Sequence, residues 1–447
     1  MGKLESPVLS SLLPHSPAPH ESPVKARAGL LRFITAGSVD DGKSTLIGRL
    51  LYDSKGLLAD QVTALETASR RRGMAQIDLS LLTDGLLAER EQGITIDVAY
   101  RYFATPSRKF IIGDSPGHVQ YTRNMVTAAS TADVAVLLVD AQQGIQAQTR
   151  RHAYLARWVG IRRVVLAVNK MDLADWSEAR FNQICDDFRS FADELGFLDT
   201  RPIPLSALAG DMVVERGEAL PWYRGPTLLQ YLETVPARHD DAGVSALRFP
   251  VQRVTRVTSR NNQNGWNGGE LRGYQGTVAS GRIAVGDEIV VLPAGLPARV
   301  SEILTAEGAQ PEALADQAVT IRLDRELDIS RGDVFAPASA PARIDSEFDA
   351  EVCWFDTDAL QPSRNYLLKQ GTQLAKARFK HVGTRLDIST LKPGKQATTL
   401  AMNDIAQVRM QLQRPIAVDS YRQNRVTGAF ILIDEVSNRT VAGGTIA

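Results

Sequence analysis

Cysteine is scarce in this chain of 447 residues, which contains only Cys185 and Cys353. Two cysteines are too few for a disulfide framework or a structural zinc site, and such scarcity is typical of proteins that work in a reducing cytoplasm. Cys185 falls in a segment with apolar residues at helical spacing, where a core position explains it better than chemistry does. We therefore expect a cytoplasmic protein.

Long apolar segments are also absent. No run is long enough to cross a membrane as a helix, so we expect no membrane partner. Residues 1–28 are rich in Pro and Ser and lack the apolar stretch of a secretory signal peptide. Because a segment of this composition buries little apolar surface, we expect residues 1–28 to be a disordered extension.

The chain has no excess of charge of either sign, since Lys and Arg total 51 and Asp and Glu total 51. It therefore lacks the overall positive field that gathers nucleic acid. A local patch could still exist, and Arg70, Arg71 and Arg72 form one basic cluster, although a solvated helix end is the simpler explanation. We do not expect nucleic acid as a partner.

The length and the hydrophobic content of 44% suit about three domains with separate cores. Residues 29–237 read as alternating strands and helices, which predicts an α/β domain with a parallel-rich sheet and helices on both faces. A polar linker follows, and the pattern then changes to short alternating runs divided by Gly and Pro. This pattern predicts two β-barrels, at residues 238–343 and 344–447, and neither contains a catalytic cluster.

The most informative motif is residues 37–44, where two glycines enclose four residues and precede Lys43 and Ser44. It directly follows the apolar run 30–34, so a strand is expected to turn sharply into a helix. Backbone N–H groups in such a turn point at phosphates, and glycine allows their close approach. We expect Lys43 to reach the β and γ phosphates of a nucleoside triphosphate and Ser44 to ligate Mg²⁺. The alternative is a glycine-rich turn without a ligand. The phosphate-binding set is Gly37, Ser38, Val39, Asp40, Asp41, Gly42, Lys43, Ser44 and Thr45.

A second apolar run, 109–113, leads into Asp114-Ser115-Pro116-Gly117, in which a carboxylate at a strand end faces the magnesium ion. We expect Asp114 to contact Mg²⁺ through water. Gly117 can offer an unobstructed N–H to the γ-phosphate, so this loop can respond to the presence of that phosphate. Taken alone, these four residues could equally form an ordinary turn.

A third apolar run, 163–168, precedes Asn169, Lys170 and Asp172, which supply what guanine requires. Asp172 can accept from the ring N1–H and the exocyclic amine, whereas adenine would leave this carboxylate buried and unpaired. We expect Asn169 to connect the base loop to the phosphate loop and the Lys170 stem to lie over the base.

The set ends with Ser206, Ala207 and Leu208, which follow a short apolar run. Here the backbone N–H of Ala207 is expected to reach the guanine O6. Four motifs in the order typical of guanine-nucleotide-binding proteins predict that this chain binds GTP and GDP.

Two further residues are candidates for the hydrolysis itself, together with Lys43. The Thr95 hydroxyl can bind Mg²⁺ and its N–H the γ-phosphate, which would order its segment only in the triphosphate state. That segment also reads as a charged helix end followed by a strand, and the two interpretations are compatible. His118 directly follows Gly117 and is the candidate for orienting the attacking water, although a lone histidine is often structural.

With these residues in place, the chain resembles the translational GTPase superfamily, and within it the GTP-dependent large subunits of heterodimeric bacterial sulfate adenylyltransferases. Elongation factor Tu and its kin usually carry histidines in the phosphate loop where this chain has Ser38 and Asp41. The resemblance spans about residues 29 to 447, and it is carried by residues 37–51, 89–103, 120–125 and 423–428.

The resemblance implies a subunit whose GTP hydrolysis promotes the synthesis of adenosine 5′-phosphosulfate and pyrophosphate from ATP and sulfate. Adenylyl transfer itself would belong to a small partner subunit, in a heterodimer. Some family members carry a fused adenylylsulfate kinase domain with a second phosphate loop, and this sequence contains no second loop. The polar stretch 258–269 is longer than the family leads us to expect, and it is either a flexible insertion or a contact with partner or substrate.

A second hypothesis uses the same domains. An elongation-factor-type switch would carry aminoacylated tRNA, and it too would combine a GTPase domain with two barrels. Asp41 in the phosphate loop and the C-terminal segment 423–428 favour the sulfate-activating branch.

Overall fold

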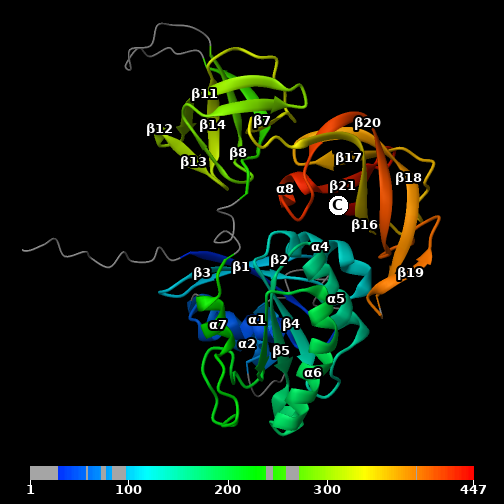
Figure 1. Ribbon diagram of the computed structural model, residues 1–447. Helices are drawn as coiled ribbons and strands as arrows, with labels where there is room; N and C mark the ends of the chain where they lie inside the picture. Colours follow the sequence, from blue (N-terminus) through cyan, green and yellow to red (C-terminus); the bar gives the residue numbers. More distant parts are fainter. Residues whose placement is uncertain are drawn as a thin grey trace, which may run out of the picture.

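The computed structural model describes residues 29–56, 59–71, 77–82, 97–237, 245–257, 271–388 and 390–447. The predicted extension 1–28, the candidate Thr95 and the polar stretch 258–269 lie outside these residues. The chain forms three units, a mixed α/β domain and two β-barrels (Figure 1).

The α/β domain is built on one sheet with the strand order β2-β3-β1-β4-β5-β6. Its strands are β1 (Leu30–Ala36), β2 (Ala99–Ala104), β3 (Lys109–Asp114), β4 (Val134–Asp140), β5 (Arg163–Asn169) and β6 (Asp199–Pro204). All neighbouring pairs are parallel except β2 and β3. The carboxyl ends of the parallel strands therefore meet at one edge of the sheet, where the loops predicted to bind nucleotide also begin.

Helices cover both faces of this sheet (Figure 1). They are α1 (Lys43–Asp53), α2 (Ala59–Arg71), η1 (Leu79–Leu82), η2 (Val119–Tyr121), α4 (Thr122–Ser130), α5 (Ala147–Trp158), η3 (Met171–Ala174), α6 (Glu178–Leu195) and α7 (Leu228–Thr234). One core contains Met125, Leu155 and Ile184 from α4, α5 and α6, and the other contains Leu46 and Leu228 from α1 and α7. Cys185 is buried in the first core, as expected, and this burial raises the pKa of its thiol to about 12.

Each barrel is an antiparallel sheet closed on itself. The first has the order β10-β15-β7-β8-β14-β11, is closed by the β10–β11 pairing, and carries β12 at its edge. Its strands are β7 (Phe249–Val257), β8 (Leu271–Thr277), β10 (Glu288–Leu292), β11 (Leu296–Thr305), β12 (Gly308–Gln310), β14 (Ala318–Leu323) and β15 (Val334–Pro337), beside the separate pair β9 (Arg282–Ala284) and β13 (Glu312–Leu314).

The second barrel has the order β17-β21-β22-β16-β20-β18, is closed by the β17–β18 pairing, and carries β19 at its edge. Its elements are β16 (Arg343–Trp354), β17 (Tyr366–Gln370), β18 (Gln373–Asp387), β19 (Lys392–Gln396), β20 (Ile405–Val418), α8 (Arg425–Gly428), β21 (Ala429–Asp434) and β22 (Thr440–Ile446). Among the described strands, closure leaves no long sheet edge exposed in either barrel, which helps to stabilise short alternating strands. The predicted fold class is confirmed.

Buried polar contacts join the two barrels. The Arg248 guanidinium donates to both carboxylate oxygens of Asp419 at 2.8 Å, and both side chains are largely buried. Close by, Asn424 Nδ2 donates to the Ser280 hydroxyl at 2.6 Å. Bidentate geometry and burial make such a contact specific as well as strong. In the described part of the chain, no helix is both long and apolar enough to span a membrane.

Candidate functional site

The phosphate loop connects β1 to α1 at the carboxyl edge of the sheet. Asp40 and Gly42 have positive φ angles of 67° and 90°, a conformation that turns successive N–H groups to one side and suits an anion. Gly42 is also required by packing, because a Cβ there would lie 2.4 Å from Asn169 Nδ2. The buried Asp41 carboxylate accepts the Ser38 N–H inside the loop, and burial raises its pKa.

Lys43 begins α1 and is folded back over the loop. Its Nζ donates to Ser38 O at 2.7 Å and to Gly37 O at 3.0 Å, and the side chain is buried. Burial lowers the Lys43 pKa, while the nearby Asp114 and Asp41 carboxylates oppose that shift. A buried ammonium that donates to neutral carbonyls is stabilised strongly when a polyphosphate binds beside it. The environment of Lys43 therefore favours an anionic ligand.

Gly117 packs directly against this loop. A Cβ on Gly117 would lie 2.6 Å from Lys43 Nζ and 2.8 Å from Gly37 O. Only a residue without a side chain can bring its backbone this close to the lysine. The sequence separates Gly117 from Lys43 by 74 positions, and the parallel pairing of β1 with β3 brings them together.

Asn169 connects the base loop to the phosphate loop, as the sequence predicts. It is buried at the end of β5, where its Nδ2 donates to Asp41 O at 2.8 Å and its Oδ1 accepts from the Ala207 N–H at 2.9 Å. The Ala207 N–H, expected to face guanine, is thus already engaged by Asn169. Ser206 is buried beside it and Leu208 is exposed.

The two charged residues after Asn169 have different surroundings. Lys170 has a positive φ of 61°, and its Nζ pairs with Asp140 at the end of β4, 2.8 Å away, which fixes the direction of its stem. Asp172 contrasts with it, because its Oδ1 is buried and has no hydrogen-bond partner among the described residues. A buried carboxylate oxygen without a donor is costly, and the N1–H or amine of a guanine would supply one.

The candidate magnesium ligands come from three segments. Ser44 lies in the first turn of α1, and Asp114 is buried at the end of β3, where Thr35 Oγ1 donates to it at 3.4 Å. Hydroxyl and carboxylate oxygens are donors that suit Mg²⁺. Thr95, the third expected ligand, lies outside the described residues, so its role stays a prediction.

His118 follows Gly117 and is exposed. Its Nδ1 accepts the Gln120 N–H at 3.3 Å, and its ring meets the Tyr121 ring edge-on, with centroids 6.1 Å apart. The side chain is therefore held loosely beside the loop rather than packed into the core. Its proposed role in orienting water stays a prediction.

A second histidine, which sequence reasoning missed, lies behind the Gly117 loop. His152 of α5 is 2% exposed, and Gln148, one turn earlier, connects it to the loop. Gln148 Nε2 lies 2.9 Å from His152 Nε2 and 3.2 Å from Gly117 O. The only sequence signal is the spacing of four residues, which places Gln148 and His152 on one helix face.

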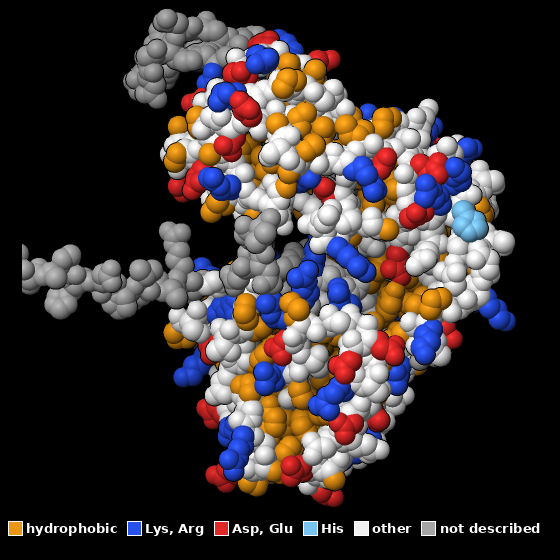
Figure 2. Space-filling view, in the orientation of Figure 1, with side chains coloured by type: hydrophobic (Ala, Val, Ile, Leu, Met, Phe, Trp, Pro, Cys, Tyr) orange, Lys and Arg blue, Asp and Glu red, His pale blue; other side chains and the backbone are white. Residues whose placement is uncertain are grey.

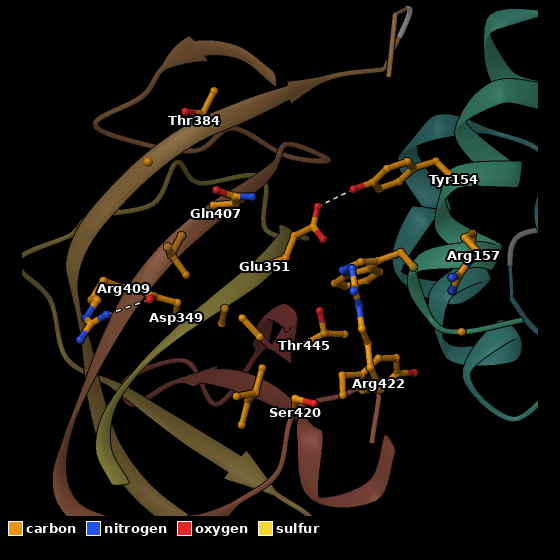
Figure 3. A pocket seen from close by; sticks show the side chains of 18 of the residues that line it. Tyr154, Arg157, Asp349, Glu351, Thr384, Gln407, Arg409, Ser420, Arg422 and Thr445 are labelled. Atoms are coloured by element: carbon orange, nitrogen blue, oxygen red, sulfur yellow. Dashed lines mark hydrogen bonds and ion pairs between the residues drawn. The ribbon is translucent and has the colours of Figure 1, made fainter. Parts of the chain in front are cut away.

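The far end of α5 faces the second barrel across a pocket of about 1540 Å³. Tyr154 extends from α5 and donates to Glu351 of β16 (Figure 3), and Tyr421 OH donates to Val159 O at 2.7 Å. Burial raises the pKa of both Tyr154 and Glu351.

Charged side chains surround this space. Five arginines contribute to the lining, namely Arg157, Arg162, Arg409, Arg422 and Arg425. Figure 2 shows Lys and Arg side chains beside the hollow between the α/β domain and the barrels, while acidic and basic side chains are mixed over the rest of the visible face.

Comparison with known proteins agrees with this geometry. Residues 29–237 match the elongation factor Tu GTP binding domain family, and residues 347–447 match the GTP-eEF1A C-terminal domain-like family. The sulfate adenylyltransferase subunit 1 of Chromobacterium violaceum is 50% identical over 93% of this chain and 86% of its own length. The chain belongs to the sulfate adenylyltransferase subunit 1 family. The resemblance stated from the motifs is confirmed, and residues 29–237 are a GTP-binding domain.

Other family members extend the comparison. The subunit 1 of Aliarcobacter butzleri is 48% identical over 93% of this chain and 87% of its own length. The bifunctional enzyme CysN/CysC of Mycobacterium tuberculosis is 52% identical over 93% of this chain, but the chain spans only 67% of that protein. The match to the bifunctional enzyme therefore leaves about a third of its length without a counterpart here.

Proposed function

We propose that this chain is the GTP-hydrolysing subunit of a sulfate adenylyltransferase, which couples GTP hydrolysis to the synthesis of adenosine 5′-phosphosulfate and pyrophosphate from ATP and sulfate. The observation that carries this proposal is the identity of 46% to 50% over 93% of the chain to proteins named sulfate adenylyltransferase subunit 1. The match extends through the GTP-binding domain and into the barrels, so it is not explained by a shared GTPase domain alone.

Within this proposal GTP binds along the carboxyl edge of the sheet. Residues 37–45 hold the phosphates, with Lys43 exchanging the Gly37 and Ser38 carbonyls for phosphate oxygens. Asp172 recognises the base, Lys170 supports its face, and Asn169 keeps the Ala207 segment next to the phosphate loop. His118 orients the attacking water, and Gly117 responds to the γ-phosphate.

Magnesium would be held by Ser44, Thr95 and Asp114, the last through water. When bound, it would neutralise charge on the β and γ phosphates. The residues of this chain do the rest of the work: Lys43 binds the phosphates, the packed loop excludes solvent from the buried lysine, and His118 lies one residue from Gly117.

The partner is a small subunit that carries out adenylyl transfer in a cytoplasmic heterodimer. Adenosine 5′-phosphosulfate joins two strong-acid anions in a mixed anhydride, so its formation is uphill and a second hydrolysed nucleotide has a physical purpose. The decisive experiment measures sulfate- and ATP-dependent pyrophosphate release by this chain with its cognate small subunit, with and without GTP. Strong stimulation by GTP is expected, and the Lys43→Ala variant should show none.

The alternative, an elongation-factor-type carrier of aminoacyl-tRNA, is less well supported by the named relatives. Absence of GTP stimulation, with intact GTP binding and tight GTP-dependent binding of aminoacyl-tRNA, would overturn the proposal in favour of that alternative.

A further inference from the structure

Gln148 is a single side chain that contacts both the Gly117 loop and the buried histidine of α5. Its amide nitrogen lies 3.2 Å from Gly117 O and 2.9 Å from His152 Nε2. A carbonyl oxygen can only accept, so the amide nitrogen, and not the amide oxygen, must face Gly117. The second amide hydrogen is then directed to His152.

This arrangement decides the state of the histidine. His152 Nε2 has to accept the Gln148 hydrogen, so the ring must be neutral with its proton on Nδ1. Burial agrees with this assignment, because it lowers the pKa of His152 to about 3, helped by the charges of Lys43 and Arg151. The Nδ1 atom is itself buried without a hydrogen-bond partner among the described residues.

A core histidine with an unpaired N–H is a poor choice for stability alone. An unpaired buried donor costs about 1–3 kcal/mol, which a leucine of similar volume would avoid. The presence of Gln148 and His152 is explained if His152 Nε2 is needed as a hydrogen-bond acceptor. By accepting from Gln148, it supports the contact between Gln148 and Gly117. That contact matters because the Gly117 backbone lies against Lys43 and Gly37, where any shift of the loop meets the phosphate-binding lysine.

We propose that Gln148 and His152 are positioning residues for GTP hydrolysis, which hold the Gly117 peptide in register with the phosphate loop. The proposal rests on the proposed role of Gly117 in sensing the γ-phosphate. His152 acts through Gln148 and touches no nucleotide. Gln148 sets the direction of the Gly117 carbonyl and of the His118 N–H, which shares its peptide plane. The Gly117 N–H lies on the preceding peptide and is restrained through the Gly117 Cα that joins the two planes.

The test compares variants of the full chain that differ only in hydrogen bonding. Gln148→Glu keeps the shape but cannot donate to Gly117 O. His152→Leu keeps the volume but cannot accept from Gln148, whereas His152→Gln restores an acceptor near the position of Nε2. Single-turnover GTP hydrolysis and the dissociation constants of fluorescent GDP and of a non-hydrolysable GTP analogue are measured for each.

Gln148→Glu and His152→Leu should lower the hydrolysis rate and the preference for the GTP analogue over GDP about tenfold each, with GDP affinity within about twofold of the parent. His152→Gln should recover to within about threefold of the parent. Tyr154→Phe is the matched control on the same helix, since it breaks only the contact with Glu351 and should leave all three quantities unchanged.

Parental hydrolysis and selectivity in His152→Leu would overturn the proposal, as would equal damage in His152→Gln and His152→Leu. These outcomes differ from a failure of the proposed function, in which the parent chain would bind GTP but GTP would not stimulate pyrophosphate release with the small subunit.

Discussion

Replacement of Asp172 by asparagine should exchange the base specificity of the site. In the described structure Asp172 Oδ1 is buried and lacks a donor, so the parent site is completed by a base that presents N–H groups there. Guanine offers its N1–H and its amine, and each hydrogen bond to a charged group contributes about 1.5–3 kcal/mol. Loss of both should weaken GDP binding by roughly two to four orders of magnitude. Xanthine replaces the amine by a carbonyl, which the asparagine amide can meet, so xanthosine diphosphate should bind the variant better than GDP.

The assay is displacement of a fluorescent GDP by unlabelled GDP or xanthosine diphosphate from parent and variant. The control is Asp175→Asn, because Asp175 lies in the same loop, is exposed, and has a positive φ of 50° that asparagine tolerates. The control should keep the parental preference for GDP. Unchanged GDP affinity in Asp172→Asn would refute the assignment of this carboxylate to guanine.

Three further predictions follow from the site and its surroundings. Lys43→Ala should abolish GTP binding in a filter or fluorescence assay, while His118→Ala should keep GTP binding and lose GTP hydrolysis. Equal loss of GTP binding in both variants would contradict the assignment of phosphate binding to Lys43 and of water orientation to His118. Arg248→Met should lower the free energy of unfolding by about 3–5 kcal/mol, because it leaves the buried Asp419 without its cationic partner, with only the Thr427 hydroxyl still donating to it among the side chains described. The double variant Arg248→Met with Asp419→Leu should recover most of this loss in chemical denaturation. An Arg248→Met variant as stable as the parent would show that the pair is not structural. The pKa of His152 is about 3 in the folded chain and 6.5, the ordinary value, in the unfolded chain. Between these two pH values His152 is protonated only in the unfolded chain, so the free energy of unfolding falls as the pH drops below 6.5. At pH 5 the loss is about 2 kcal/mol relative to neutral pH. In unfolding measured against pH, the free energies of the parent and of His152→Leu should therefore differ by a constant amount above pH 7 and diverge below 6.5.

The sequence predicts the α/β domain well because each apolar run predicts a strand and the motif that follows it marks the carboxyl end of that strand. Runs such as 109–113 and 163–168 became β3 and β5, and each motif begins where its strand ends. Parallel strands bring those ends to one edge, so motif order along the chain converts directly into proximity.

The contacts that the sequence could not predict are those made by residues with an ordinary local explanation. His152 reads as one more residue of an amphipathic helix, and only the structure places it one turn from a side chain that reaches Gly117. The pairing of Lys170 with Asp140 likewise depends on the β4–β5 register, in which Asp140 lies opposite Asn169. The pattern of one sequence predicts the periodicity of helices and strands and which of their faces are buried. Side-chain pairs such as Lys170 with Asp140 depend in addition on which strands become neighbours.

The contacts between the two barrels have a mechanical consequence. Arg248 and Asp419 belong to different barrels, and so do Ser280 and Asn424, yet all four side chains are buried in one seam. Separating the barrels would break a buried bidentate ion pair and the Asn424–Ser280 hydrogen bond together, whereas the second barrel meets the end of α5 through hydroxyl contacts such as Tyr421 with Val159. If a change of nucleotide reorients the barrels, both should therefore rotate together as one rigid body about the contact with α5. The displacement at the far end of that body is then set by the combined length of the two barrels.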